Sequence, residues 1–463
     1  MAPSNPVHPY IPNSAPRIRR EMLATLGLSD VSELFSEIPE HLRLTAPLDV
    51  PGPLSEAELA RHIRGLLAQN SSCEDVLSFL GGGCWQHFVP AVCDEIAGRG
   101  EFLTAYTGDT YEDHGRWQAL FEFASLLGEV LNMEAVSTPT YDWGQAVATS
   151  MRMAGRATGR REVLVPRHMS PERLSIIRSY LHPAMEVRMF DETASGQVTP
   201  ESIRPLLHSG TAAVYFENPS YDGVIQVEAE AVALQAHRAN ALCLVGCDPL
   251  SLGVLAPPAD YGADIVTGDL QPLGIRMQYG GGLAGFIATR DEPWLVMELP
   301  TRLVGITTTA VPGEYGFGEV AFSRTSFVER ERGKEYVGTG TNLWGITAGV
   351  YLALLGPAGL RQLGEGIMRR TRYAMERIAG LPGVRVPRLA EPHFKEFMVC
   401  FQETGQTVAS INRALRDKGI YGGHDLSRDF PEYGQCALYC VTEIHRQADI
   451  DRLVAALGEV TAQ

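Results

Sequence analysis

The chain has 463 residues, with 39 Lys plus Arg against 55 Asp plus Glu and a formal net charge of −16. This acidic balance argues against a surface for nucleic acid or anionic membrane, because affinity for phosphate groups comes from clustered cations. The length and the hydrophobic fraction of 45% predict a globular protein of two or three domains, at about 150 residues per domain. Three of the cations are lysines, namely Lys334, Lys395 and Lys418.

The N-terminal part of the chain contains short helical patterns. Ser55 followed by Glu58 is a capping-box pair at the start of a helix. Apolar residues then recur at helical spacing on one face, which we expect to be buried: Leu59, Ile63, Leu66 and Leu67. Residues 1–75 are therefore predicted to form a helical arm laid on a larger domain. Because no apolar run near the N-terminus is long enough for a signal peptide or a membrane span, we expect a cytoplasmic protein.

The middle of the chain alternates helical patterns with short apolar runs. Four of these runs read as strands: Glu162–Val165, Ala212–Phe216, Leu242–Val245 and Asp264–Val266. Strands that are apolar on both faces and joined by helix-length connections predict a parallel sheet covered on both sides. Residues 76–335 are therefore predicted to form a large α/β domain.

The remaining residues, 336–463, predict a smaller α+β domain. The long helices expected here are Gly345–Leu355 and Ala358–Leu381, and the strands are Phe397–Phe401 and Ala437–Val441. The chain's eight cysteines contain no CxxC pair, and a protein of this size does not need disulfides to fold. We expect them to be buried free thiols, not metal ligands.

Two loops have the composition of ligand-binding turns. Gly81, Gly82 and Gly83 would let the backbone approach a ligand closely, but their spacing matches no nucleotide-binding motif, and a turn between helices is an equal alternative. Asp142 precedes an alanine-rich helix whose exposed amides would either hold an anion or be capped by the Asp142 side chain, and we favour the cap.

Asp248 follows a buried strand, at the edge of the sheet where α/β folds bind ligands. In pyridoxal-phosphate enzymes of the aspartate-aminotransferase fold, such an aspartate pairs with the pyridine nitrogen, and a strand about 20 to 30 residues later supplies the Schiff-base lysine. Here that position holds Leu270 or Gln271, and a Schiff base cannot form without a primary amine. Lys395 and Lys418 lie in the smaller domain, where we expect solvated side chains.

Six segments in a fixed order carry a family resemblance. They are Pro9–Pro12, Leu34–Pro39, Glu101–Thr107, Asp248–Gly253, Tyr261–Val266 and Gln271–Gly274. Together they resemble subunit 1 of the two-chain glycine decarboxylase, the P-protein of the glycine cleavage system, over nearly the whole chain. The resemblance implies an aspartate-aminotransferase-like α/β fold (pyridoxal-phosphate fold type I), with a mainly parallel sheet in the large domain, the N-terminal arm and the small C-terminal domain.

The resemblance also implies a partner. In that family subunit 1 lacks the cofactor lysine and completes a site with subunit 2 in an α2β2 heterotetramer. The implied reaction is decarboxylation of glycine on pyridoxal phosphate, with transfer of the aminomethyl group to the lipoyl arm of an H-protein-like carrier. The cofactor would be held by the partner subunit's lysine.

The catalytic candidates are Tyr106 and Thr107, which lie in a retained motif, and His87. Tyr106 is equally consistent with a packed core position. His87 would serve in proton transfer or cofactor stacking, or be a hydrogen-bonded structural histidine. Asp248 and Gln271 are interpreted as relics of a cofactor site, with Asp248 capping or anchoring the loop after its strand.

Four further residues are candidates for a loop that contacts the partner or the substrate: Gly82, Gly83, Lys334 and Asn342. Lys334 and Asn342 match retained family positions. Lys334 also lies in a charge-rich stretch that would ordinarily be a solvated surface.

The chain departs from the family pattern at 108–117, at 143 and at 335–341. Bulky Trp85, Trp117 and Trp143 would reshape a pocket built for the smallest amino acid. One alternative is therefore a specialised biosynthetic paralogue that acts with a second subunit on a glycine-derived or other small amino acid. Another alternative is a non-catalytic scaffold subunit.

Overall fold

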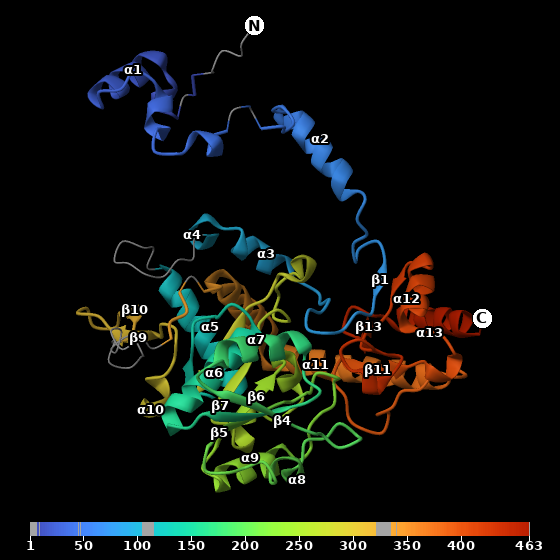
Figure 1. The fold of residues 1–463 in the computed structure, drawn as a ribbon. Helices are drawn as coiled ribbons and strands as arrows, with labels where there is room; N and C mark the ends of the chain where they lie inside the picture. Colours follow the sequence, from blue (N-terminus) through green and yellow to red (C-terminus); the bar gives the residue numbers. More distant parts are fainter. Residues whose placement is uncertain are drawn as a thin grey trace. The chain divides into compact units, whose positions relative to one another are not determined.

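The computed structural model describes residues 7–8, 10–44, 46, 48–103, 115–320, 335–338 and 340–462. The chain divides into two compact units, residues 1–70 and residues 71–463. Each unit is described by itself (Figure 1). The finer boundaries at 75/76 and 335/336 stay predictions.

The first unit consists of short helices. Its elements are η1 (Pro12–Ser14), α1 (Pro16–Thr25), η2 (Val31–Phe35), η3 (Glu40–Leu42) and α2 (Glu56–Leu67). The predicted capping box is confirmed, because Glu58 accepts the backbone N–H of Ser55 at 2.9 Å. Within this unit the α2 stripe is exposed, with Leu59 49% exposed and Ile63 43% exposed, and its burial against a larger domain stays a prediction. No described residue of the first unit belongs to one of the apolar core clusters.

The second unit is built on a seven-stranded sheet in the order β2-β8-β7-β6-β5-β3-β4. The strands are β2 (Ala135–Val136), β3 (Glu162–Pro166), β4 (Glu186–Phe190), β5 (Thr211–Glu217), β6 (Leu242–Cys247), β7 (Ile265–Asp269) and β8 (Gly285–Thr289). Strands β4, β3, β5, β6 and β7 run parallel, and β8 is antiparallel to both of its neighbours. All four predicted strands are confirmed, and every residue of β3, β5 and β7 is buried.

Two apolar cores cover the two faces of this sheet. Along β5, Val214 belongs to one core and Tyr215 to the other, as alternation along a strand requires. One face packs on α6 (Trp143–Thr158) and α7 (Pro171–Leu181), and the other on α5 (Gly115–Leu131), α9 (Ala229–Arg238) and α11 (Asn342–Ala379). The smaller elements of this part are α3 (Ala91–Ala97), α4 (Gly100–Leu103), α8 (Pro200–Ile203), η4 (Pro249–Gly253), η5 (Pro258–Tyr261), η6 (Gln278–Gly280), α10 (Pro293–Val296) and the hairpin β9 (Val304–Thr308) with β10 (Tyr315–Glu319).

Helix α11 is broken where the sequence predicts two helices. Gly356 has φ 57° and ψ −178°, and Pro357 follows it, so the backbone leaves the helical conformation there. By length and composition α11 is the one helix among the described residues that is long and apolar enough to cross a membrane. It packs against α5 and α3, and residues such as Ile367 are fully buried, so it is a core helix of this unit.

The C-terminal elements form a smaller sheet with its own core. This sheet has the order β11-β14-β13 and consists of β11 (Glu396–Cys400), β13 (His424–Asp425) and β14 (Cys436–Cys440); beside it lie α12 (Val408–Asp417), α13 (Gln447–Thr461), η9 (Gln402–Thr404) and η10 (Pro431–Tyr433). Strand β1 (Leu77–Ser78) pairs in parallel with β12 (Ile420–Tyr421), so the start of this unit lies among the C-terminal elements (Figure 1). The glycine loop at 81–83 therefore begins beside the smaller sheet.

One expectation about the cysteines is wrong. Cys400 on β11 lies directly opposite Cys436 on β14, and the two form a disulfide. Their sequence separation of 36 gives no sign of this pairing, which depends on the register of two antiparallel strands. The other six cysteines are free thiols.

Candidate functional site

The candidate site is centred on Asp248, which follows β6 and is 5% exposed. One oxygen of its carboxylate accepts the backbone N–H of Leu250 at 3.0 Å. The other oxygen lies 2.5 Å from the Nζ atom of Lys395, whose side chain is 2% exposed. The expectation that Lys395 is solvated is therefore wrong, because the segment before β11 carries it into the space beyond the end of β6.

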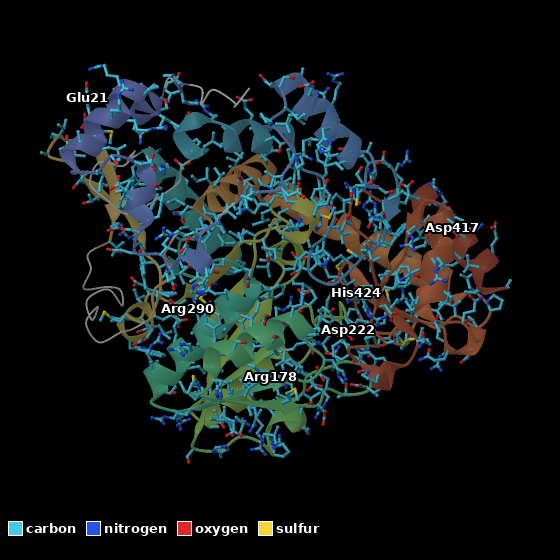
Figure 2. The ribbon with its side chains drawn as sticks, turned by 45° about the horizontal axis from the view of Figure 1, so that its top comes forward. Glu21, Arg178, Asp222, Arg290, Asp417 and His424 are labelled. Atoms are coloured by element: carbon cyan, nitrogen blue, oxygen red, sulfur yellow. A yellow bond between two sulfur atoms is a disulfide. The ribbon has the colours of Figure 1, made fainter. Side chains whose placement is uncertain are left out.

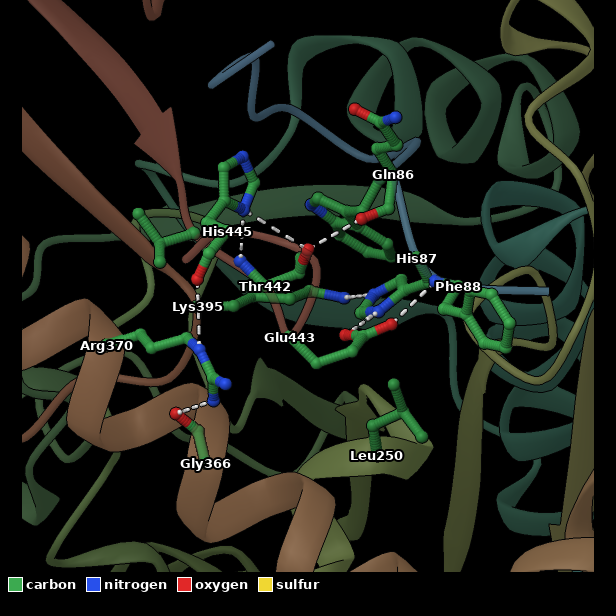
Figure 3. A network of polar contacts seen from close by, with 12 residues as sticks. Gln86, His87, Phe88, Leu250, Gly366, Arg370, Lys395, Thr442, Glu443 and His445 are labelled. Carbon is green, nitrogen blue, oxygen red and sulfur yellow. Dashed lines mark hydrogen bonds and ion pairs between the residues drawn. The ribbon is translucent and has the colours of Figure 1, made fainter. Parts of the chain in front are cut away.

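The Lys395 ammonium has two further contacts, and Figure 3 shows the one with His87. It lies 3.3 Å from Nε2 of His87 and 3.3 Å from the centroid of the Trp85 ring. An ammonium group can only donate hydrogen bonds, so Nε2 of His87 is the acceptor. The other ring nitrogen of His87, Nδ1, then carries the proton and donates it to Glu443 at 2.8 Å.

Glu443 ends this chain of contacts. Its second oxygen accepts the backbone N–H of Phe88 at 2.6 Å. Burial alone would raise the pKa of this carboxyl, but the contact with His87 and the hydrogen bond from Phe88 outweigh burial and lower the pKa to about 2. The same loop is tied to the 86–88 segment a second time, because the Thr442 hydroxyl donates to the carbonyl of Gln86 at 2.7 Å (Figure 3).

The glycine loop approaches a carboxylate of this chain. The backbone N–H of Gly82 donates to Oε1 of Glu396 at 2.7 Å, and Glu396 is buried. A Cβ atom on Gly81 would stand 2.7 Å from the same oxygen, while Gly82 and Gly83 have φ values of +105° and +119°. Burial raises the pKa of Glu396, and neighbouring Lys395 opposes that shift. The close approach that the glycines permit is therefore directed at Glu396.

Both the carbonyl oxygen and the NH2 group of the Gln271 side chain are hydrogen-bonded. Its carbonyl oxygen accepts the N–H of Trp85 at 3.1 Å, and its NH2 group donates to the carbonyls of Trp85 and Ile275 at 2.9 and 3.1 Å. The residue is 1% exposed. It fastens the Trp85 segment to the loop after β7, and it offers no amine.

The N-terminus of α6 is capped by Asp142, whose carboxylate accepts the N–H of Gln145 at 2.8 Å. The next residue, Trp143, is 5% exposed, and the Arg173 guanidinium lies 4.2 Å from the centroid of its ring. Arg173 in turn makes a bidentate pair with Glu217 at 2.9 and 2.8 Å. Of the two predicted alternatives for this helix end, the structure shows the cap.

These side chains enclose one pocket. Its lining includes Trp85, Trp143, Arg173, Glu217, Asp248 and Lys395. A neighbouring pocket shares Glu217 and Tyr221 with it and is lined by Asp222, labelled in Figure 2, which is paired with Arg388. Within the ranges that the structure describes, no group of three or more His, Cys, Asp or Glu side chains could hold a metal ion.

Pyridoxal phosphate does not fit these residues. The fold places a lysine, an aspartate free to pair with the ring nitrogen, and helix amides free to bind phosphate around that cofactor. Here Leu270 or Gln271, neither of which is an amine, stands where the lysine is expected, Asp248 is already paired with Lys395, and a carboxylate caps α6 beside Trp143. The pocket of this chain is therefore filled by its own side chains.

Four further predicted site residues remain, and the structure describes one of them, Asn342. Tyr106, Thr107 and Lys334 lie outside the described residues, so their roles stay predictions. Asn342 is buried at the first position of α11, where the preceding Thr341 hydroxyl donates to the carbonyl of Thr140 at 2.7 Å. Asn342 does not belong to the lining of the pocket beside Lys395.

Sequence reasoning missed five of the site residues described above: Lys395, Glu396, Glu443, Arg173 and Glu217. A signal for the first two exists, since this charged pair stands between Phe394 and Phe397 at the start of an apolar strand. A charged pair inside an apolar run is a candidate for burial with partners. Nothing local marks Glu443.

Comparison with known proteins gives one consistent result. The family model described as "Glycine cleavage system P-protein" matches residues 8–457. Proteins named probable glycine dehydrogenase (decarboxylating) subunit 1 are 38% identical in Aeropyrum pernix and 35% identical in Staphylothermus marinus; both alignments cover 98% of this chain, with 99% and 98% of the respective relatives.

Solved structures agree with this result. A glycine decarboxylase (P-protein) of the glycine cleavage system, crystallised in inhibitor-bound form, has a TM-score of 0.86 and 33% identity, over 98% of this chain and 100% of that chain. A sphingosine-1-phosphate lyase from Burkholderia pseudomallei has a TM-score of 0.64 at 16% identity, over 90% and 93% of the two chains, which shows the fold alone. The expected aspartate-aminotransferase-like fold is confirmed.

Proposed function

Because this chain belongs to the glycine cleavage system P-protein family, we propose that it is the subunit of a two-chain glycine decarboxylase that carries no cofactor lysine. Its relatives are named subunit 1 of a glycine dehydrogenase (decarboxylating), and a numbered subunit requires a second one. The complex decarboxylates glycine and passes the aminomethyl group to a lipoyl-bearing carrier protein.

One observation carries this proposal beyond the family name. The position where the fold is expected to place its Schiff-base lysine holds Leu270 or Gln271, and both ends of the Gln271 amide are hydrogen-bonded to backbone. Among the described residues that line the pocket, the one lysine is Lys395, and it is engaged with Asp248. A chain with this pocket needs another polypeptide to supply the amine, so pyridoxal phosphate belongs to the partner subunit's lysine in an α2β2 assembly. There the cofactor supplies the electron sink for the carbanion left by loss of CO2.

The test of this function reconstitutes the complex. The purified chain is mixed with a subunit 2, pyridoxal phosphate, lipoylated H-protein and glycine, and exchange of labelled CO2 into the glycine carboxyl group is measured. We expect exchange only when both chains are present. Omission of each component in turn is the control, and no exchange with a partner that is active with its own subunit 1 would contradict the proposal.

The specialised paralogue remains the alternative outcome of that experiment. Two substitutions that motivated it, Trp85 and Trp143, are buried and line the pocket of this chain. The two tryptophans fill part of the pocket of this chain, and they say nothing about which substrate fits the pocket of a second chain. A complex that forms, shows no exchange with glycine and turns over another small amino acid would favour the paralogue.

The scaffold alternative is tested at His87, whose side chain is 1% exposed and contacts Lys395 and Glu443. His87→Asn is compared with the matched control His424→Asn, at a histidine whose side chain is 44% exposed. Loss of turnover in the first variant alone, with the complex intact by size-exclusion chromatography, rejects a scaffold. Unchanged turnover in both variants favours it.

A further inference from the structure

Lys395 supplies the cation that pairs with the buried carboxylate of Asp248 at the end of β6. Its ammonium touches the Asp248 carboxylate, Nε2 of His87 and the face of the Trp85 ring, so three different groups surround it. A buried ion pair is tolerated only when its remaining hydrogen-bonding groups are also satisfied. An indole face adds attraction for the cation on the side that offers no acceptor.

The cavity next to Asp248 thus has the chemistry of a site for an organic cation. In catalytic members of this fold, the strand-end aspartate faces a cationic ring nitrogen. We propose that the Lys395 side chain is the resident ligand of this site: its ammonium takes the place of the ring nitrogen, neutralises Asp248 and closes the pocket to a cofactor. Without that side chain, the site takes a small primary ammonium ion from solution.

The backbone supports this assignment independently of the side-chain contacts. Lys395 has φ +41°, in the left-handed region that residues with a side chain seldom adopt. Its carbonyl accepts the N–H of Val441 at 2.8 Å, which ties the segment to the residue directly after β14. Strained residues persist where surrounding contacts over-determine them. The strain here turns the lysine away from the smaller sheet and towards the end of β6.

The Lys395 side chain also joins two parts of the second unit. Asp248 follows a strand of the large sheet, whereas Lys395 precedes β11 of the smaller one. His87 is 308 positions away from Lys395 in the sequence and contacts the same ammonium. Removal of the cation should therefore lower the stability of the whole unit, beyond any local loosening of the pocket.

The test uses Lys395→Ala in the free full-length chain, with propylammonium chloride as the probe. Propylammonium supplies the atoms that the substitution removes beyond Cβ. We expect the melting temperature of the variant to fall by about 5 °C and to recover by about 2 °C or more, saturably, as propylammonium is added. Sodium chloride and propan-1-ol at equal concentration are the controls for ionic strength and for filling of the pocket by an apolar group. Neither should raise the melting temperature of the variant.

Two further proteins keep the test decisive if Lys395→Ala does not fold. Propylammonium should not raise the melting temperature of wild-type protein, because the Lys395 side chain already occupies the site. It should not raise that of the double variant Asp248→Asn/Lys395→Met either, because this variant lacks the carboxylate. The double variant should fold and melt within about 3 °C of wild type, because both charges are gone together.

The proposal is overturned if propylammonium stabilises Lys395→Ala no more than propan-1-ol does. It is overturned equally if Lys395→Met alone melts at the wild-type temperature, which would show that Asp248 needs no cation. All of these measurements use the chain without its partner, so their failure is separate from failure of the proposed decarboxylase function.

Discussion

Lys395 and Lys418 each place an ammonium 2.5 Å from a carboxylate, in two regions that differ in exposure. Lys395 lies in the pocket at the end of β6, where its side chain is 2% exposed and that of Asp248 is 6% exposed. Lys418 follows α12 at the surface, where its side chain is 38% exposed and that of its partner Glu459 is 65% exposed.

Equal distances therefore describe two different interactions. Water solvates both members of the surface pair when they separate, so such a pair contributes about 0 to 1 kcal/mol to the free energy of unfolding. In the pocket, a carboxylate that loses its cation stays buried without compensation. Distance alone does not rank ion pairs, and the surroundings of the unpaired group decide the cost of breaking one.

Lys395→Met should lower the stability of the chain more than any other substitution considered for the two ion pairs. The substitution keeps most of the side-chain volume and removes the charge, so Asp248 is left unpaired. We expect the free energy of unfolding to fall by about 3 to 5 kcal/mol, measured by denaturant titration of the free chain at pH 7. Adding Asp248→Asn to this variant should recover most of that loss, and a double variant as unstable as the single one would show that packing, not charge, sets the effect.

Glu443→Gln tests how the stability that a buried carboxylate of the site contributes depends on pH. The pKa of Glu443 is lowered from 4.5 to about 2 in the folded chain, so the carboxylate stabilises the fold fully above about pH 4.5 and loses this effect as the pH falls towards 2. We expect the variant to lose up to about 3 kcal/mol at pH 7. Its stability should fall less steeply with acid than that of wild type, as measured by melting temperature from pH 7 to pH 3. Parallel curves for the two proteins would contradict this account of Glu443.

Lys418→Met should have the smallest effect and serves as the matched control. It makes the same substitution as Lys395→Met at an exposed pair of the same length. We expect a change of no more than about 1 kcal/mol in the free energy of unfolding. A loss as large as that of Lys395→Met would mean that burial does not distinguish the two regions.

Much of the fold could be predicted from the sequence because it depends on local patterns. The β-branched runs of β3, β5, β6 and β7 mark strands that are buried on both faces, and Gly356-Pro357 marks the break in α11. Strand β4 was not predicted because it lies at the sheet edge, where its burial alternates with exposure and its composition is mixed.

The candidate site could be predicted only in part. Asp248 and the missing lysine at Gln271 are visible because both positions follow strands. The burial of Lys395 depends on contacts between a sheet edge, a glycine-rich loop and a second sheet, which no window of sequence contains. The same limit applies to the disulfide between Cys400 and Cys436. The number of lysines in the sequence does not show that one of them, Lys395, pairs with the aspartate that would otherwise face the cofactor's ring nitrogen.

Because this chain closes its own pocket, it should not hold the cofactor. To test this directly, the free chain is incubated with pyridoxal phosphate and reduced with borohydride, and the pyridoxylated lysines are mapped by mass spectrometry. We expect no modification of Lys395, and only weak, unsaturable modification of exposed Lys418. A stoichiometric pyridoxyl group on Lys395 would contradict the claim, since it would show a lysine free to leave Asp248 and react with the cofactor.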